Sequence, residues 1–135
     1  RRIERLSQNL FICAPHASQL LAKYSIDYKD DLQKNIEIYK RNRKNLLLKL
    51  PKFGFEILSS PDGAFYIYCG IEKISNNSIK LCEKIFEDTG VAITPGVDFD
   101  ERRGMKTVRF SYATSEDKIQ NALKRLGLYF RDKVF

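Results

Sequence analysis

The sequence predicts a small α+β domain in which helices pack on one face of a short, largely antiparallel sheet. Segments with a helical spacing of apolar residues occur at both ends of the chain, and strand-like runs lie between them. A hairpin pattern in the middle favours antiparallel pairing. The expected order is helices, hairpin, helix, strand, strand, helix. A length of 135 residues fits one domain, and we predict a single domain over residues 1–135.

The first part of the chain is expected to be helical. Residues 1–10 have the pattern of the end of a helix, a short helix follows Pro15, and a longer one opens at Asp30. Acidic residues come first and basic residues last in the longer helix, as the helix dipole favours, and Pro51 marks its end. The dense basic run KRNRK, residues 40–44, is interpreted as a solvated face of this helix.

The clearest hairpin pairs residues 55–58 with residues 64–69. Between these runs, Pro61 pre-sets its own φ angle, Asp62 offers a local side-chain hydrogen bond, and Gly63 is expected at a positive φ.

A helix is expected after residues 75–77, which offer capping side chains, and Gly90 is expected in the left-handed conformation at its end. Its predicted buried stripe consists of Ile79, Cys82, Ile85 and Phe86. Residues 91–94 follow as a short strand, which a proline and a glycine end. A polar loop then leads to the last strand.

The stretch TVRFSYATSED, residues 107–117, combines a strand with a helix start. Thr114 and Asp117 have the spacing of a capping box, and Gly127 either ends the final helix or is tolerated within it. The expected apolar face of this helix consists of Ile119, Ala122, Leu123 and Leu126.

Arg109 lies in the middle of this strand, on the face opposite Val108 and Phe110. A guanidinium on a rigid strand is suited to grip a carboxylate through two parallel N–H···O bonds. Periodicity alone leaves two interpretations open: an ordinary solvated arginine, or an arginine aimed at an anion.

The composition limits which metal-binding or catalytic sites the chain can form. His16 is the only histidine, so the chain cannot form a site with several histidine ligands, and we predict no metal site and no catalytic residue. Pairing of His16 with a cysteine stays open, because the sequence does not show which side chains lie close together. Cys13, Cys69 and Cys82 lack metal or disulfide spacing, so they are interpreted as buried side chains in a reducing, cytoplasmic compartment. No apolar run is long enough to span a membrane.

Three motifs in the right order carry a resemblance to a known family. They are GFEILSSPDGAFYIY, GVAITPGVDFD and TVRFSYATSED, and upstream of them NLFICAPHASQLLA fits the same pattern. Together they resemble the C-terminal part of class I/II, fold-type-I aminotransferases. The resemblance covers nearly the whole chain.

The resemblance implies that Arg109 binds the α-carboxylate of an amino-acid substrate, and that residues 95–99 line the entrance of the site. It implies pyridoxal phosphate as cofactor of the parent enzyme, amino-acid and 2-oxo-acid substrates, and a homodimeric parent. The family's Schiff-base lysine segment has no match here, so no cofactor-binding residue is predicted. The chain is therefore expected to be a C-terminal small domain, inactive by itself, which does not hold the cofactor tightly and tends to self-associate.

Two alternatives stay open. A net charge of +7 and the basic run are compatible with a nucleic-acid-binding domain, although no recognisable nucleic-acid-binding motif is present. A stand-alone binding or interaction module with the same fold is the other. The sequence upstream of Arg1 distinguishes this second alternative, because a large α/β domain there would exclude a stand-alone module.

Overall fold

The computed structural model describes residues 1–131, and the chain divides into two compact units, Arg1–Asn35 and a second that begins at Ile36. The first unit contains α1 (Arg2–Leu10), α2 (His16–Ser25) and the start of α3 (Lys29–Lys49). The predicted helices are therefore present. Every side chain of this unit is exposed, including many large apolar ones.

Cys13 lies between α1 and α2 and is exposed. The prediction of three buried cysteines was therefore wrong for Cys13, because its unit has no buried core to receive it. Cys69 and Cys82 are buried, and all three thiols are free.

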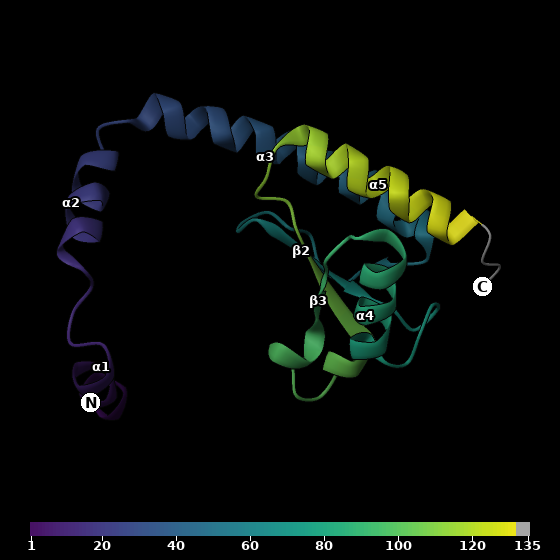
Figure 1. The fold of residues 1–135 in the computed structure, drawn as a ribbon, viewed down its shortest axis with the longest axis horizontal. Coiled ribbons are helices and arrows are strands. Elements are labelled where there is room, and N and C mark those ends of the chain that lie inside the picture. The colour runs from purple at the N-terminus through teal and green to yellow at the C-terminus, as the bar shows by residue number, and fades with distance from the viewer. Residues whose placement is uncertain (132–135) are drawn as a thin grey trace. The chain divides into compact units, whose positions relative to one another are not determined.

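The second unit is built on a four-stranded antiparallel sheet with the order β1-β2-β4-β3 (Figure 1). The strands are β1 (Glu56–Ile57), β2 (Tyr66–Gly70), β3 (Thr94–Pro95) and β4 (Thr107–Ser111). β2 and β4 form the long central pair, and the shorter β1 and β3 flank it. The predicted hairpin and the predicted antiparallel sheet are thus confirmed, although β3 is shorter and begins later than expected.

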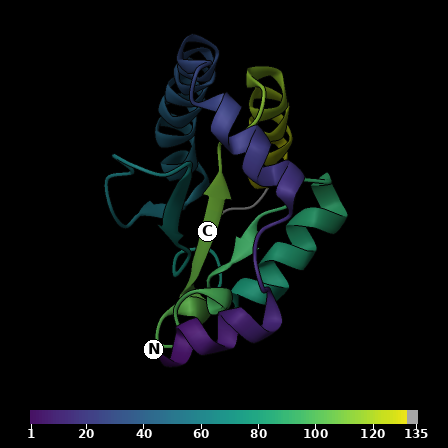
Figure 2. The same cartoon turned by 90° about the vertical axis from the view of Figure 1, so that its left-hand side faces the viewer.

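Three helical segments pack on one face of this sheet: the end of α3 together with the 3₁₀ turn η1 (Leu50–Phe53), α4 (Ser78–Thr89), and α5 (Glu116–Arg131). Figure 2 shows the later turns of α3 and α5 as neighbouring helices, which an ion pair between Arg41 and Glu116 links. The prediction of helices on a single face is confirmed. The core between helices and sheet includes Leu46, Leu50, Phe55, Ile67, Cys69, Ile85, Val108, Phe110, Leu126 and Phe130.

Asn42 connects α3 to the end of β4. Its side chain is fully buried, and its amide nitrogen donates to the carbonyl oxygens of Tyr112 (3.1 Å) and Thr114 (2.7 Å). These two carbonyls follow the strand that carries Arg109, so the helix fixes the course of the chain as it leaves the sheet.

The left-handed residue of the β1–β2 connection differs from the prediction. Ala64 has a φ of 57°, whereas Gly63 lies outside the left-handed region. The strands are separated by a loop longer than a tight turn, and Ala64 is held because its carbonyl accepts a 3.3 Å hydrogen bond from the Tyr112 hydroxyl. The positive φ predicted for Gly63 was therefore wrong by one residue.

Two helix ends behave as the sequence predicts. Gly90 ends α4 with a φ of 68°, and Asn77 caps its start by accepting from the Lys80 amide. Gly127 lies inside α5. The sequence predicted Thr114 as the cap of the last helix, but α5 begins at Glu116, and the backbone carbonyl of Ser115 accepts from the Ile119 amide.

The buried face of α4 was predicted only in part. Cys82 and Ile85 are buried, but Ile79 and Phe86 are exposed, and Ser78 and Leu81 take their places. No helix within residues 1–131 has both the length and the apolar composition needed to cross a membrane.

Candidate functional site

Arg109 is placed by the alternation of side chains along β4. Val108 and Phe110 are buried in the core, so Arg109 lies on the opposite face of the sheet. Its direct cross-strand neighbours are Tyr68 on β2 and Thr94 on β3. The arginine is therefore presented by the most central position that this sheet offers.

The guanidinium of Arg109 lies between two aromatic rings. Its Cζ atom is 3.9 Å from the ring centroid of Phe99 and 4.9 Å from that of Tyr66. Both distances are within the range of cation–π contacts. Arg109 is half-buried, and no acidic side chain within residues 1–131 pairs with it.

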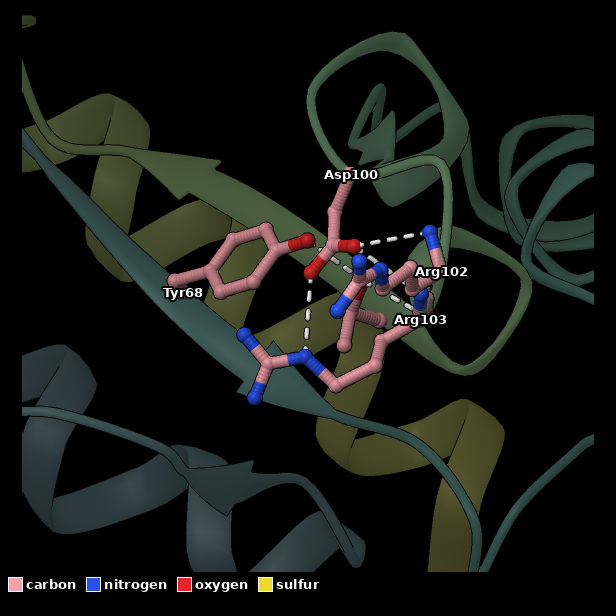
Figure 3. Close-up of polar contacts among 5 residues, drawn as sticks. Tyr68, Asp100, Arg102 and Arg103 are labelled. Atoms are coloured by element: carbon pink, nitrogen blue, oxygen red, sulfur yellow. Dashed lines mark hydrogen bonds and ion pairs between the residues drawn. The ribbon is translucent and has the colours of Figure 1, made fainter.

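Phe99 belongs to a loop that joins β3 to β4 and contains two 3₁₀ turns, η2 (Gly96–Asp98) and η3 (Gly104–Lys106). Asp100 organises the loop (Figure 3): one carboxylate oxygen accepts from the backbone amides of Arg102 (3.0 Å) and Arg103 (2.9 Å). The other oxygen accepts from Nε of Arg103 at 3.0 Å. The carboxylate of Asp100 is therefore engaged within its own loop.

These contacts set the protonation of Asp100. The hydrogen bond from the Arg103 backbone amide, followed by further bonds and the charge of Arg103, holds the pKa of the Asp100 carboxyl below its ordinary value. The loop consequently carries an anionic side chain at neutral pH.

Two glycines close the loop upon itself. A Cβ atom on Gly104 would lie 2.5 Å from Cα of Val97 and 2.6 Å from its nitrogen, and a Cβ on Gly96 would collide with the hydroxyl oxygen of Thr107. Ser78 at the start of α4 donates to the carbonyl of Gly104 at 2.7 Å. Close backbone contact and this hydrogen bond thus fix the loop that carries Phe99.

A hollow of about 240 Å³ lies beside the guanidinium. Tyr66, Tyr68, Phe99, Asp100 and Arg109 line it. A larger hollow of about 450 Å³ runs along β3 and α5, and it also reaches Arg109. We place the candidate site at the smaller one, because it gathers the guanidinium, two tyrosines and the ordered loop.

The remaining candidates from the sequence lie elsewhere. His16 is exposed at the first position of α2. Within the basic run, Lys40 pairs with Glu37, and Arg41 pairs with Glu116. The positive charge of this run is therefore partly neutralised by these two ion pairs. Within residues 1–131, no group of three His, Cys, Asp or Glu side chains is arranged to hold a metal ion.

The family model for class I and II aminotransferases matches residues 2–126, nearly the whole chain. The chain belongs to the class I and II aminotransferase family. Its similarity to individual members is consistent with this. It is 38% identical over 129 residues to valine–pyruvate aminotransferase of Mycobacterium tuberculosis, covering 94% of this chain and 33% of that protein.

Two further relatives extend the comparison. The chain is 32% identical to (5-formylfuran-3-yl)methyl phosphate transaminase of Methanocaldococcus jannaschii, covering 92% of this chain and 33% of that protein. It superposes with a TM-score of 0.86 and 46% identity on a crystal structure from Silicibacter pomeroyi assigned as an aminotransferase, covering 98% and 36% of the two chains. The chain thus spans about a third of the length of the curated relatives it matches.

This aminotransferase family uses pyridoxal phosphate. The residues around Arg109 do not fit that group, because none of the five residues lining the hollow is a lysine that could bond its aldehyde. This hollow therefore offers the guanidinium of Arg109 to an anionic group, but no amine for the aldehyde of the cofactor.

Sequence reasoning singled out Arg109 from the alternation of the strand, and the family resemblance pointed to residues 95–99. It did not identify Tyr66, Tyr68 or Asp100 as neighbours of the guanidinium. Alternation along residues 64–69 places both tyrosines on one face, so pairing the two strands in register would have found them. Asp100 lies in an irregular loop, where no alternation of side chains predicts its position.

Proposed function

We propose that Arg109 binds the substrate α-carboxylate in an aminotransferase that moves an amino group between an amino acid and a 2-oxo acid with pyridoxal phosphate. One observation carries the proposal: a half-buried guanidinium, on the central strand, borders a hollow without an acidic partner for its own charge among the described residues. Membership of the family supports it.

Both substrates of such a reaction carry the same group at the same place. An amino acid and a 2-oxo acid each have a carboxylate next to the reacting carbon, so one planar fork serves both half-reactions. Bidentate binding fixes the rotation of the substrate as well as its position, and this orientation is what aligns the reacting bond with the cofactor.

The rest of the machinery is proposed to lie in a larger protein. We propose that residues 1–135 form the C-terminal small domain of this enzyme, since the chain spans about a third of its relatives. A separate large domain would supply the Schiff-base lysine and the other contacts to the cofactor. On this proposal the chain is inactive by itself, and the parent enzyme is a cytoplasmic homodimer.

The identity of the side chain on the substrate is a separate matter. One relative is named for valine and pyruvate and another for a furan aldehyde phosphate, although both are similar to this chain over more than nine-tenths of its length. We therefore limit the proposal to the shared carboxylate and amino-group chemistry.

The test is Arg109→Ala in the full-length enzyme. Loss of two charge-assisted hydrogen bonds is expected to raise KM for the amino acid on the order of 100-fold. Absorbance of the bound cofactor should stay unchanged. Activity toward the corresponding amino-acid amide, which lacks the carboxylate, should change much less.

Arg102→Ala is the matched control, because Arg102 lies in the same loop region with an exposed side chain and contributes only its backbone amide to Asp100. It should behave like the unmodified enzyme. Normal kinetics for Arg109→Ala would remove Arg109 from this role.

A further inference from the structure

We propose that Phe99 is a positioning residue, which holds the guanidinium of Arg109 with its N–H edges free for the substrate carboxylate. This inference rests on the carboxylate-binding role proposed above for Arg109. It adds a residue that does not bond the substrate and acts only through the arginine.

The contact itself has a specific geometry. The guanidinium carbon lies 3.9 Å from the centroid of the Phe99 ring, and Tyr66 provides a second ring at 4.9 Å. An aromatic face attracts the cation without accepting its conventional N–H hydrogen bonds. The five N–H groups, which form the fork, are therefore left for a planar acceptor.

Neighbouring acids do not compete for the fork. Asp100 lines the same hollow, but both of its oxygens accept hydrogen bonds from Arg102 and Arg103. Among the ion pairs of the described residues, none includes Arg109. The guanidinium of Arg109 thus contacts the Phe99 ring and forms no ion pair with a carboxylate of residues 1–131.

The backbone fixes Phe99 itself. Its amide donates to the carbonyl of Gly96 at 2.9 Å, and the close contact between Gly104 and Val97 closes the same loop. Yet the Phe99 side chain is 52% exposed, which is unusual for a residue whose purpose is to fill a core. A rigid backbone that presents an exposed ring to a cation is an arrangement for positioning.

The consequence for binding is a smaller loss of side-chain freedom. A long arginine side chain loses rotamer entropy when a ligand fixes it, and a side chain that is already held loses less. A different position of Arg109 in the substrate complex would change the expected effect on KM. If the carboxylate pulled Arg109 away from the ring, Phe99 would oppose binding, and its removal would lower KM.

The experiment is a double-mutant cycle in the full-length enzyme, with Phe99→Leu, Arg109→Ala and the two combined. Phe99→Leu should raise KM for the amino acid about three- to fivefold, as expected for a partly exposed cation–π contact, with kcat nearly unchanged. In the Arg109→Ala background the same substitution should have no further effect. Phe99→Tyr, which keeps the ring, should stay within about twofold of the unmodified enzyme.

The two proposals fail in different ways. If Arg109→Ala has normal kinetics, the carboxylate-binding role is wrong. If Arg109→Ala is impaired but Phe99→Leu leaves KM unchanged or lowers it, or acts equally in both backgrounds, the positioning role alone is wrong.

A second readout uses the full-length enzyme and needs no activity. The Nε–H signal of Arg109, followed by NMR relaxation, should become more mobile in Phe99→Leu and stay ordered in Phe99→Tyr. Because Phe99 is exposed, neither variant should change the thermal unfolding midpoint substantially. Equal mobility of the Arg109 signal in all three proteins would overturn the proposal.

Discussion

The hydroxyl groups of Tyr68 on β2 and Thr107 on β4 share a 2.6 Å hydrogen bond. The direction of this bond follows from the partner. The single hydroxyl hydrogen of Thr107 is used in a 3.2 Å bond to the carbonyl of Arg103, so the tyrosine is the donor. Strand pairing and loop geometry are therefore joined at one buried threonine.

Tyr68→Phe should destabilise this chain by about 1 kcal/mol, because the buried hydroxyl oxygen of Thr107 loses the hydrogen bond that Tyr68 donates. The measurement is urea unfolding of the chain followed by circular dichroism. Tyr66→Phe is the matched control: Tyr66 also lies on β2, and its side chain acts in this site through the face of its ring. A destabilisation of similar size in both variants would argue against a specific bond to Thr107.

Gly104→Ala should destabilise the chain by about 2–3 kcal/mol, near the upper end for ordinary substitutions, because its Cβ would meet the Val97 backbone at 2.5 Å. Backbone atoms cannot turn aside as a side chain can. Gly63→Ala is the control, since a Cβ at that position meets nothing within 4 Å and the backbone there is not left-handed. Urea unfolding should leave Gly63→Ala neutral or slightly more stable. Equal stability of the two variants would show that the loop yields freely.

Local chemistry predicted much of the fold. Pro51, Gly90 and the order of charges along α3 mark helix ends through backbone rules that hold in any context. Alternation along residues 107–111 placed Arg109 opposite the core for the same reason. These features depend on near neighbours in the sequence, which is why a single sequence contains them.

Features that depend on tertiary contacts were not predictable in this way. Apolar residues occur on several sides of α4, so periodicity did not reveal that Leu81 would be buried and Phe86 exposed. The contact of Phe99 with Arg109 depends on the shape of an irregular loop, which Gly96 and Gly104 set through close backbone approach. Neither has a repeating pattern from which it could be deduced.

The buried thiols predict a loss of stability in alkaline solution. Burial raises the pKa of the Cys69 thiol to about 12, and burial together with the nearby charges of Glu83 and Asp98 raises that of Cys82 to about 11. Both values are above the ordinary value of 9.0, so the unfolded chain releases these protons first as pH rises. Their contribution is fully present below pH 9 and is lost progressively between pH 9 and about 11 to 12.

The urea unfolding midpoint of this chain should therefore decrease between pH 8 and pH 10. The midpoint of Cys69→Ala should decrease less over the same range, because this variant lacks the buried thiol. At pH 8 its midpoint should be lower than that of the unmodified chain, because the substitution leaves a cavity. Cys13→Ala is the control, because Cys13 is exposed and its removal should leave the pH dependence unchanged. Reaction with a thiol reagent gives an independent check. Cys13 should react rapidly in the folded chain, whereas Cys69 and Cys82 should react only after unfolding, because the reactive species is an accessible thiolate. An identical pH slope in Cys69→Ala and the unmodified chain would mean that the buried thiol does not couple to folding.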